Sequence, residues 1–131
     1  MPSTIVDSHI FQGIFSTDEM RSVWSDENRT QYYLDIEAAL AKVQAKLGII
    51  PQEAADEIIS RCRLDQIDMV ELRRQTERIG YPIIAVVNQL NTLCRDDLGE
   101  YCHWGATTQD ITDTATVLQI REALDLVDDE L

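Results

Sequence analysis

The chain has few basic residues, few glycines and prolines, and no long apolar run, and each shortage excludes a class of protein. Its 131 residues contain 11 Lys and Arg against 24 Asp and Glu, a formal net charge of −13. Nucleic acids and anionic membranes bind basic surfaces, so we expect neither as a partner. No apolar run approaches the ~20 residues of a membrane-spanning helix. What remains, with 44% hydrophobic residues, is the composition of a soluble globular domain.

Patterns for disulfides, metals and cofactors are also missing. Cys62, Cys94 and Cys102 are odd in number and form no CxxC pair, so we expect three reduced, at least partly buried thiols in a cytoplasmic protein. No Ser/His/Asp arrangement, Gly-rich phosphate loop or His/Cys metal spacing is present, so we expect neither metal nor cofactor. Residues 1–10 contain an acid and no basic segment, which indicates no signal peptide.

Helix signals run through almost the whole chain. Ser16 with Glu19 and Asp68 with Glu71 are capping-box patterns, and Ser25 is a good N-cap. Pro51 suits the first position of a helix. The only strand candidate is 83–87, and its continuation favours a helix. We therefore predict an all-α fold. The expected helices cover 16–24, 25–46, 51–62, 68–78, 83–95 and 108 or 109 to the end.

Apolar residues at helical spacing predict which faces are buried. For segment 25–46 the predicted buried stripe is Tyr32, Ile36, Leu40, Val43 and Leu47. For segment 51–62 it is Ala55, Ile58, Ile59 and Cys62. For segment 83–95 it is Ile84, Val87, Leu90 and Cys94.

The last helical segment has a broad apolar band, which predicts burial against more than one neighbour. It closes on Asp128, Asp129 and Glu130 without a C-cap signal, and negative charges there oppose the helix dipole. We therefore expect the chain to be cut within a longer helix of a larger protein. On this interpretation 1–107 is an N-terminal helical domain, and 108–131 begins a long helix of a central bundle.

The segment 103–111 is the most informative for function. Thr107 and Thr108 stand where the first turn of a helix leaves its N–H groups unpaired, next to the positive end of the helix dipole. Such a place can hold a carboxylate or phosphate. The alternative is capping alone, helped by Asp110 in the first turn. For His103 the alternative is a packing or hydrogen-bonding role.

The run from His103 to Ala115 resembles the first signature region of the fumarase/aspartase superfamily. The match is to the branch that holds adenylosuccinate lyase and 3-carboxy-cis,cis-muconate cycloisomerase, where the pattern reads His-aromatic-Gly-Ala-Thr-Ser-Gln-Asp. Thr108 replaces the Ser and keeps its hydroxyl. Further segments follow the family in order: 20–26, 34–41, 47–51 and 118–124.

Two departures from the family pattern discriminate within the branch. Adenylosuccinate lyases carry an N-terminal Arg-Tyr that serves the nucleotide phosphate, whereas residues 11–15 read Phe-Gln-Gly-Ile-Phe. They also carry a His in the region of 76–82, where this chain has none. The sequence thus resembles the cycloisomerase, an enzyme of aromatic catabolism. Adenylosuccinate lyase or another lyase of the branch is the alternative, and a non-catalytic helical interaction module is the alternative of a different class.

The resemblance implies an all-α homotetramer whose active sites are built from three subunits and take a small carboxylate substrate. A base removes a proton next to a carboxylate, and the resulting carbanion is held as an aci-carboxylate. Thr107, Thr108 and Gln109 would bind the substrate carboxylate, and His103 would have a positioning role beside them. The family's second His region and mobile Ser loop correspond to positions beyond Leu131. The resemblance therefore implies no catalytic residue in this chain, and we expect the chain alone to be inactive.

Overall fold

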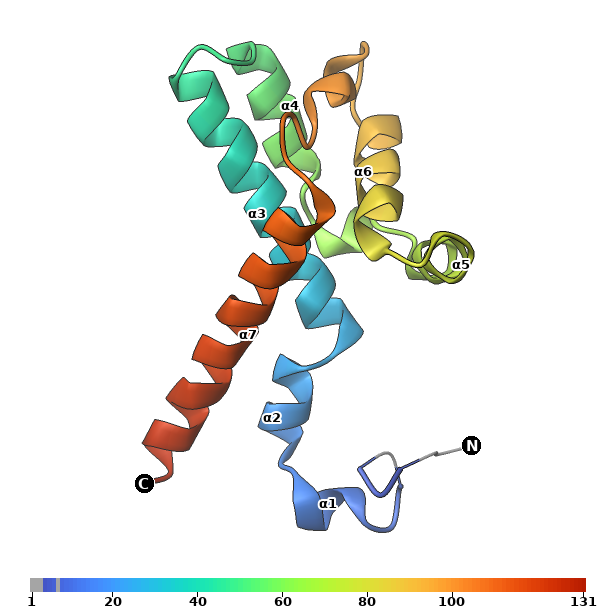
Figure 1. The fold of residues 1–131 in the computed structure, drawn as a ribbon, viewed down its shortest axis with the longest axis vertical. Helices are drawn as coiled ribbons and strands as arrows, with labels where there is room; N and C mark the ends of the chain where they lie inside the picture. The colour runs from blue at the N-terminus through green and yellow to red at the C-terminus, as the bar shows by residue number, and fades with distance from the viewer. Residues whose placement is uncertain (1–3, 7) are drawn as a thin grey trace.

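The computed structural model describes residues 4–6 and 8–131, which form helices joined by turns (Figure 1). Because the described residues contain no strand, the predicted all-α fold is confirmed. The prediction about a signal peptide falls partly on residues 1–3 and 7, outside this description. The α-helices are α1 Gln12–Phe15, α2 Asp18–Val23, α3 Asp26–Lys46, α4 Gln52–Arg61, α5 Met69–Ile79, α6 Pro82–Leu93 and α7 Thr108–Asp129. The short 3₁₀ helices are η1 Leu64–Gln66 and η2 Leu98–Tyr101.

The helix starts lie close to the predicted capping residues. The Ser25 hydroxyl accepts the N–H of Asn28 and caps α3, as predicted. At α2 the predicted cap is wrong by one residue, because Thr17 and not Ser16 accepts the N–H of Met20. The Ser16 hydroxyl instead accepts a hydrogen bond from Arg21. Where two neighbouring hydroxyls can both cap a helix, the sequence therefore predicts the first residue of that helix to within about one position.

The other starts follow the same pattern. Asp68 accepts the N–H groups of Val70 and Glu71, which confirms the start of α5. Pro51 lies immediately before α4 rather than at its first position. Helix α1 has no counterpart among the predicted helices. The helical reading of 83–87 is confirmed, since these residues lie within α6.

The core lies between α3, α4, α6 and the first half of α7. Its largest fully buried apolar side chains include Leu34, Ile58, Ile83, Leu90 and Ile111. Burying a side chain of this size contributes about 1.5–3 kcal/mol relative to leaving it exposed. The core therefore fixes the upper half of the molecule, where α3 and α4 lie side by side (Figure 1).

The predicted buried stripe of α3 is wrong. Val43 and Leu47 are 53% and 67% exposed, and Tyr32, Ile36 and Leu40 are only half-buried. Helices α4 and α7 are the main neighbours of α3, and the buried face lies about one residue further round the helix than predicted. The buried residues of α3 are Thr30, Tyr33, Leu34, Glu37 and Ala41. A charged residue, Glu37, therefore lies inside the core.

The stripes of α4 and α6 are only partly right. In α4, Ala55, Ile58 and Cys62 are buried as predicted, whereas Ile59 is exposed. In α6, Leu90 is buried as predicted, but Ile84 is 46% exposed. The residues that take the buried places of α6 are Ile83, Ala85, Val86 and Leu90.

The burial predicted for the three cysteines is confirmed. Cys62 and Cys102 are buried, Cys94 is half-buried, and all three are free thiols. Burial raises the pKa of the Cys62 thiol to about 12, because a thiolate is poorly solvated in the core.

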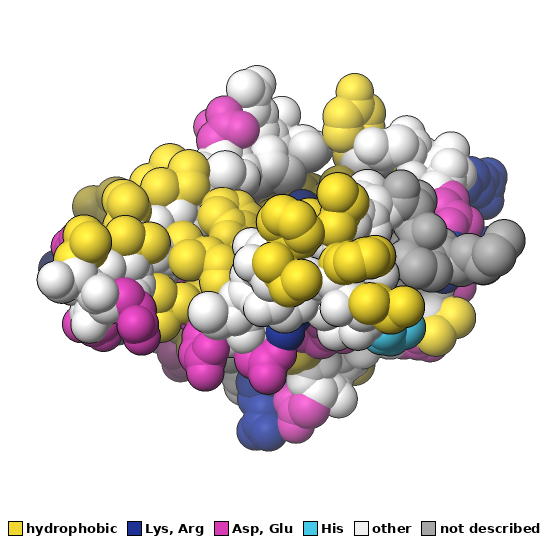
Figure 2. All heavy atoms as spheres, turned by 90° about the horizontal axis from the view of Figure 1, so that it is seen from below, with side chains coloured by type: hydrophobic (Ala, Val, Ile, Leu, Met, Phe, Trp, Pro, Cys, Tyr) yellow, Lys and Arg dark blue, Asp and Glu magenta, His cyan; other side chains and the backbone are white. Residues whose placement is uncertain are grey.

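Helix α7 packs against α3 and α2 and then runs on towards the lower end of the molecule (Figure 1). Its buried residues are Ile111, Ala115 and Gln119. It contacts more than one neighbour, as predicted, but much of the apolar band remains open: Val117 is 62% and Leu124 56% exposed. Seen from below, hydrophobic side chains gather over this end (Figure 2). The division at residue 107 stays a prediction.

A polar seam joins α7 to α2 and α3. The Gln119 side chain is fully buried, donates to the Val23 carbonyl at 2.7 Å and accepts from Arg29 at 3.2 Å. Three residues further along α7, a Glu122 oxygen accepts the hydroxyl of Tyr32 at 2.7 Å. This hydrogen bond raises the pKa of Tyr32, because it holds the phenolic proton. No helix in the described part of the chain is long and apolar enough to cross a membrane.

Candidate functional site

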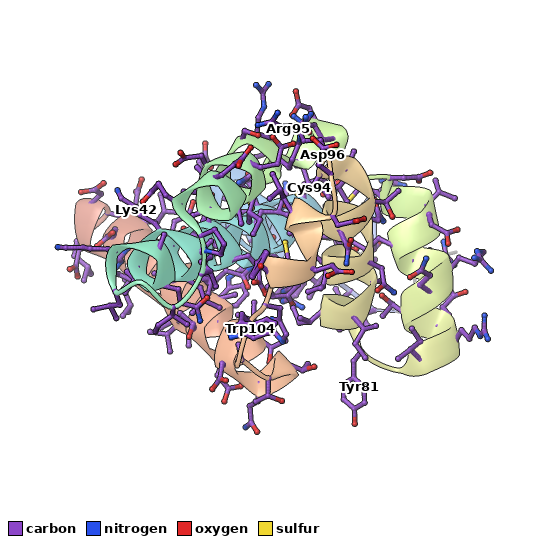
Figure 3. All side chains as sticks on the ribbon, turned by 90° about the horizontal axis from the view of Figure 1, so that it is seen from above. Lys42, Tyr81, Cys94, Arg95, Asp96 and Trp104 are labelled. Carbon is purple, nitrogen blue, oxygen red and sulfur yellow. The ribbon has the colours of Figure 1, made fainter. Side chains whose placement is uncertain are left out.

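A tight turn leads from η2 into the start of α7. His103 and Gly105 both have left-handed backbone, with φ of 57° and 71°. A left-handed φ is uncommon for a residue with a side chain, so His103 is held in a conformation that its own backbone does not favour. The N–H of Ala106 donates back to the His103 carbonyl at 3.2 Å and closes the turn. In the view from above, Trp104 lies beside the first turn of α7 (Figure 3).

Thr107 caps α7, as the alternative interpretation of this residue predicted. It has extended backbone at the N-cap position, and the Asp110 carboxylate accepts its N–H at 2.9 Å in a capping box. A negative charge in the first turn also suits the helix dipole. At this helix start the chain itself therefore supplies the acceptor for one backbone N–H and the negative charge that the helix dipole favours.

Thr108 is left with free hydrogen-bonding groups. It is the first residue of α7, is half-buried, and its hydroxyl has no hydrogen-bond partner within the described residues. The N–H groups of Thr108 and Gln109 precede the first helical hydrogen bond and have no acceptor in the helix. Here the chain still offers donors to an anionic group.

Gln109 lies on the same turn, but its side chain is engaged elsewhere. Its amide donates to Asp113 at 3.0 Å, one helical turn further along the exposed side of α7. Of the four predicted substrate-binding residues, the structure brings His103, Thr107 and Thr108 onto one short turn. It ties the Gln109 side chain to the outer face of the helix.

His103 is paired with a residue that sequence reasoning missed. Its Nδ1 lies 2.6 Å from Oε1 of Glu37 on α3, and the two side chains are 18% and 1% exposed. Burial raises the pKa of Glu37, because an ionised carboxylate is poorly solvated there, and the hydrogen bond with His103 offsets part of that rise. The other oxygen of Glu37 is buried with no partner among the described residues. The only sequence signal was a charged residue beside Leu34 and Ala41, on a face that becomes buried.

A second contact fixes the same turn to α3. The amide of Gln44 donates to the carbonyl of Trp104 at 2.7 Å. The Trp104 ring packs on Tyr101, with the ring centroids 5.9 Å apart. A hollow beside this turn is lined by Ile36 and Leu40 of α3 together with Trp104 and Ile111. The turn is therefore held from α3 at two points, by Glu37 at His103 and by Gln44 at Trp104.

The described residues contain no group of three or more His, Cys, Asp or Glu that could hold a metal ion. The donors present are hydroxyl, imidazole and backbone N–H groups at the positive end of a helix. This arrangement can bind and polarise a carboxylate.

Comparison with known proteins assigns the chain that carries this turn to a family. Residues 13–131 match the family model described as Lyase. The chain belongs to this lyase family, within the fumarase/aspartase superfamily. The resemblance carried by the run from His103 to Ala115 is thereby confirmed.

Three relatives show the range of lyase-family proteins that this chain resembles. It is 61% identical over 118 residues to trans-aconitate decarboxylase 1 of Mycosarcoma maydis, covering 90% of this chain and 24% of that protein. It is 39% identical to the adenylosuccinate lyase of Methanocaldococcus jannaschii, covering 89% and 25%. The structure of β-carboxy-cis,cis-muconate cycloisomerase from Acinetobacter calcoaceticus superposes with a TM-score of 0.85 at 38% identity, covering 91% and 29%. The chain thus spans about a quarter of the length of these lyase-family proteins.

Proposed function

We propose that the start of α7 is one wall of a carboxylate-binding active site, in an enzyme of which these residues form the N-terminal part. The observation that carries this proposal is the set of free donors at Thr108 and Gln109, at the positive end of a 22-residue helix. In a lyase reaction, charge develops on a substrate carboxylate when the neighbouring carbon loses a proton or a group. Fixed donors facing that carboxylate stabilise the charge. The catalytic base belongs to the remaining three quarters of the protein.

For the substrate, we propose a small unsaturated polycarboxylate without a nucleotide. The relative at 61% identity is named for trans-aconitate and a structural relative for a carboxymuconate, and both compounds are unsaturated tricarboxylates. The higher identity favours trans-aconitate first and the predicted carboxymuconate cycloisomerisation second. Adenylosuccinate comes third, because residues 11–15 lack the Arg-Tyr that serves the nucleotide phosphate. We also propose that the full-length protein is a cytoplasmic homotetramer.

The test is turnover by the full-length protein with each of the three substrates. Release of CO₂ from trans-aconitate supports the first candidate, and loss of carboxymuconate absorbance supports the cycloisomerase. Turnover of adenylosuccinate alone would contradict the proposed substrate class.

A pair of variants separates an active-site wall from a simple cap. Thr108→Val removes a hydroxyl that makes no hydrogen bond within the described residues, so it should leave folding intact and lower kcat by about 10²–10³. Thr107→Ser keeps both the cap and the hydroxyl and should retain activity. If Thr107→Ala with Thr108→Ala lowers only stability, by ~1–2 kcal/mol, the segment is a cap in a non-catalytic helical module.

A further inference from the structure

The contact between Glu37 and His103 joins two residues that lie 66 positions apart. Glu37 belongs to the packed centre of α3, and His103 opens the turn that carries Thr107 and Thr108. Nδ1 of the imidazole lies 2.6 Å from the carboxylate, a distance typical of a charge-assisted hydrogen bond. Nε2 has no hydrogen-bond partner within the described residues, and the ring keeps 18% of its surface exposed.

The chemistry of this contact determines what the other ring nitrogen can do. When the Glu37 carboxylate is ionised it only accepts hydrogen bonds, and Nδ1 of His103 then carries the proton between them. Nε2 is then the one ring nitrogen left to meet a ligand. A ligand carboxylate only accepts hydrogen bonds, so it requires an N–H at Nε2 when it binds there.

A role in stabilising the fold does not explain why Glu37 is buried in the core. Its second oxygen is buried without a partner, and an unpaired buried polar atom costs stability. Glu57 provides the contrast within the same chain, because both of its oxygens are bound, by Arg61 and Arg95. A buried carboxylate kept with one oxygen unpaired points to a role outside packing.

We infer that Glu37 is a positioning residue of the carboxylate-binding turn. It holds the His103 ring with Nδ1 protonated, so that Nε2 and the free donors of Thr108 meet one ligand together. This inference rests on the proposed function, because it assigns Glu37 to the same carboxylate site.

The experiment is an NMR titration of the 131-residue chain with trans-aconitate as the probe. The chain has two histidines, so ¹⁵N-labelled imidazoles with a His9→Gln background give the protonation pattern of His103 alone. The backbone amides of Thr108 and Gln109 report binding. In Glu37→Met the Nδ1-protonated signature should disappear, and binding should weaken roughly tenfold, the lower end of the loss seen when the partner of a metal-binding histidine is removed. In Glu37→Gln, whose amide oxygen can accept from Nδ1, the signature should survive and binding should weaken less.

Glu57→Gln is the matched control, since it changes the other buried glutamate and should alter neither the His103 signature nor binding. If Glu37→Met binds trans-aconitate as tightly as the unmodified chain, the positioning role is overturned while the carboxylate site stands. If the amides of the unmodified chain do not respond at all, the donors at the start of α7 do not bind a carboxylate in this chain, and the positioning role is overturned. Should Glu37→Met not fold, Glu37→Gln decides, and affinity equal to that of Glu57→Gln overturns the inference.

Discussion

At Gly99 there is room for a hydrogen atom but not for a side chain. This residue of η2 is buried against α6, and a Cβ placed on it would lie 2.5 Å from Cα and 2.7 Å from the carbonyl oxygen of Asn91. Backbone atoms cannot rotate away as a side-chain tip can. We therefore expect Gly99→Ala to lower the free energy of unfolding by about 1–3 kcal/mol, in the range of overpacked cores. Urea denaturation measures it. Gly13→Ala is the control, because nothing lies within 4 Å of its Cβ, and an equal loss there would contradict the steric explanation.

We expect pH to change the stability of the fold in opposite directions through the two buried glutamates, Glu37 and Glu57. Burial raises the pKa of Glu37 in the folded chain, whereas hydrogen bonds from Arg61 and Arg95 lower that of Glu57. A raised carboxyl pKa contributes stability that is present below the unfolded value and is lost as pH rises through the folded pKa. A lowered one contributes stability that is present above the unfolded value and is lost as pH falls through the folded pKa.

We therefore expect Glu37→Gln to gain stability relative to the unmodified chain as pH rises from about 4, the ordinary value of a glutamate, to 7. Glu57→Gln should lose stability relative to it over the same change. Urea unfolding at the two pH values measures both differences. A loss for Glu37→Gln as well would show that the Glu37 carboxylate is better stabilised by His103 than its burial suggests.

For single residues, the sequence predicts the site correctly where the interacting groups are close together in the chain. The helix start at Thr107 and Thr108 could be predicted, because capping involves residues at most three positions apart. Glu37 could not, because its partner His103 is 66 positions away and only the packing of the turn on α3 brings them together. The site residues found from the sequence are those within one turn, and the ones missed come from another helix.

Among the elements, α3 shows how a correct helix can have the wrong buried face. Its limits were predicted almost to the residue, since Ser25 and Gly48 mark them chemically. The face was displaced by one residue because apolar side chains occupy two adjacent stripes. Periodicity alone does not say which stripe the neighbouring helices cover, and here the buried stripe is the one that contains Glu37.

The polar seam between α7 and its neighbours depends on Gln119. Gln119→Leu keeps similar bulk but removes the donor to Val23 and the acceptor for Arg29, which leaves polar groups less well satisfied in a buried place. We expect a loss of about 1–3 kcal/mol in the free energy of unfolding. Gln109→Leu changes an exposed glutamine of the same helix and should stay within about 0.5 kcal/mol. Similar losses for both variants would argue against the seam as the cause.

For the molecule as a whole, the open apolar side of α7 predicts self-association of the 131-residue chain. Val117 and Leu124 are 62% and 56% exposed, and apolar surface of this kind favours contact between copies. The net charge of −13 opposes that contact. Added salt should therefore strengthen association, because it screens the repulsion. Size-exclusion chromatography with light scattering at several concentrations measures it.

A double variant locates the associating surface. Val117→Glu with Leu124→Glu should shift the chain towards monomer at every concentration. Val70→Glu, at a position on α5 that is 79% exposed, is the control and should leave the distribution unchanged. Association that survives the double variant would assign the contact to another surface.

The position of Trp104 gives the turn an optical property. The chain has two tryptophans, and this one is half exposed, one residue after His103, with its ring packed on Tyr101. In a Trp24→Phe background, all indole emission would come from the turn itself, and Tyr101 would act as a nearby donor for energy transfer. Binding of a ligand at the start of α7 would then change the intrinsic fluorescence, so it could be followed without an attached label.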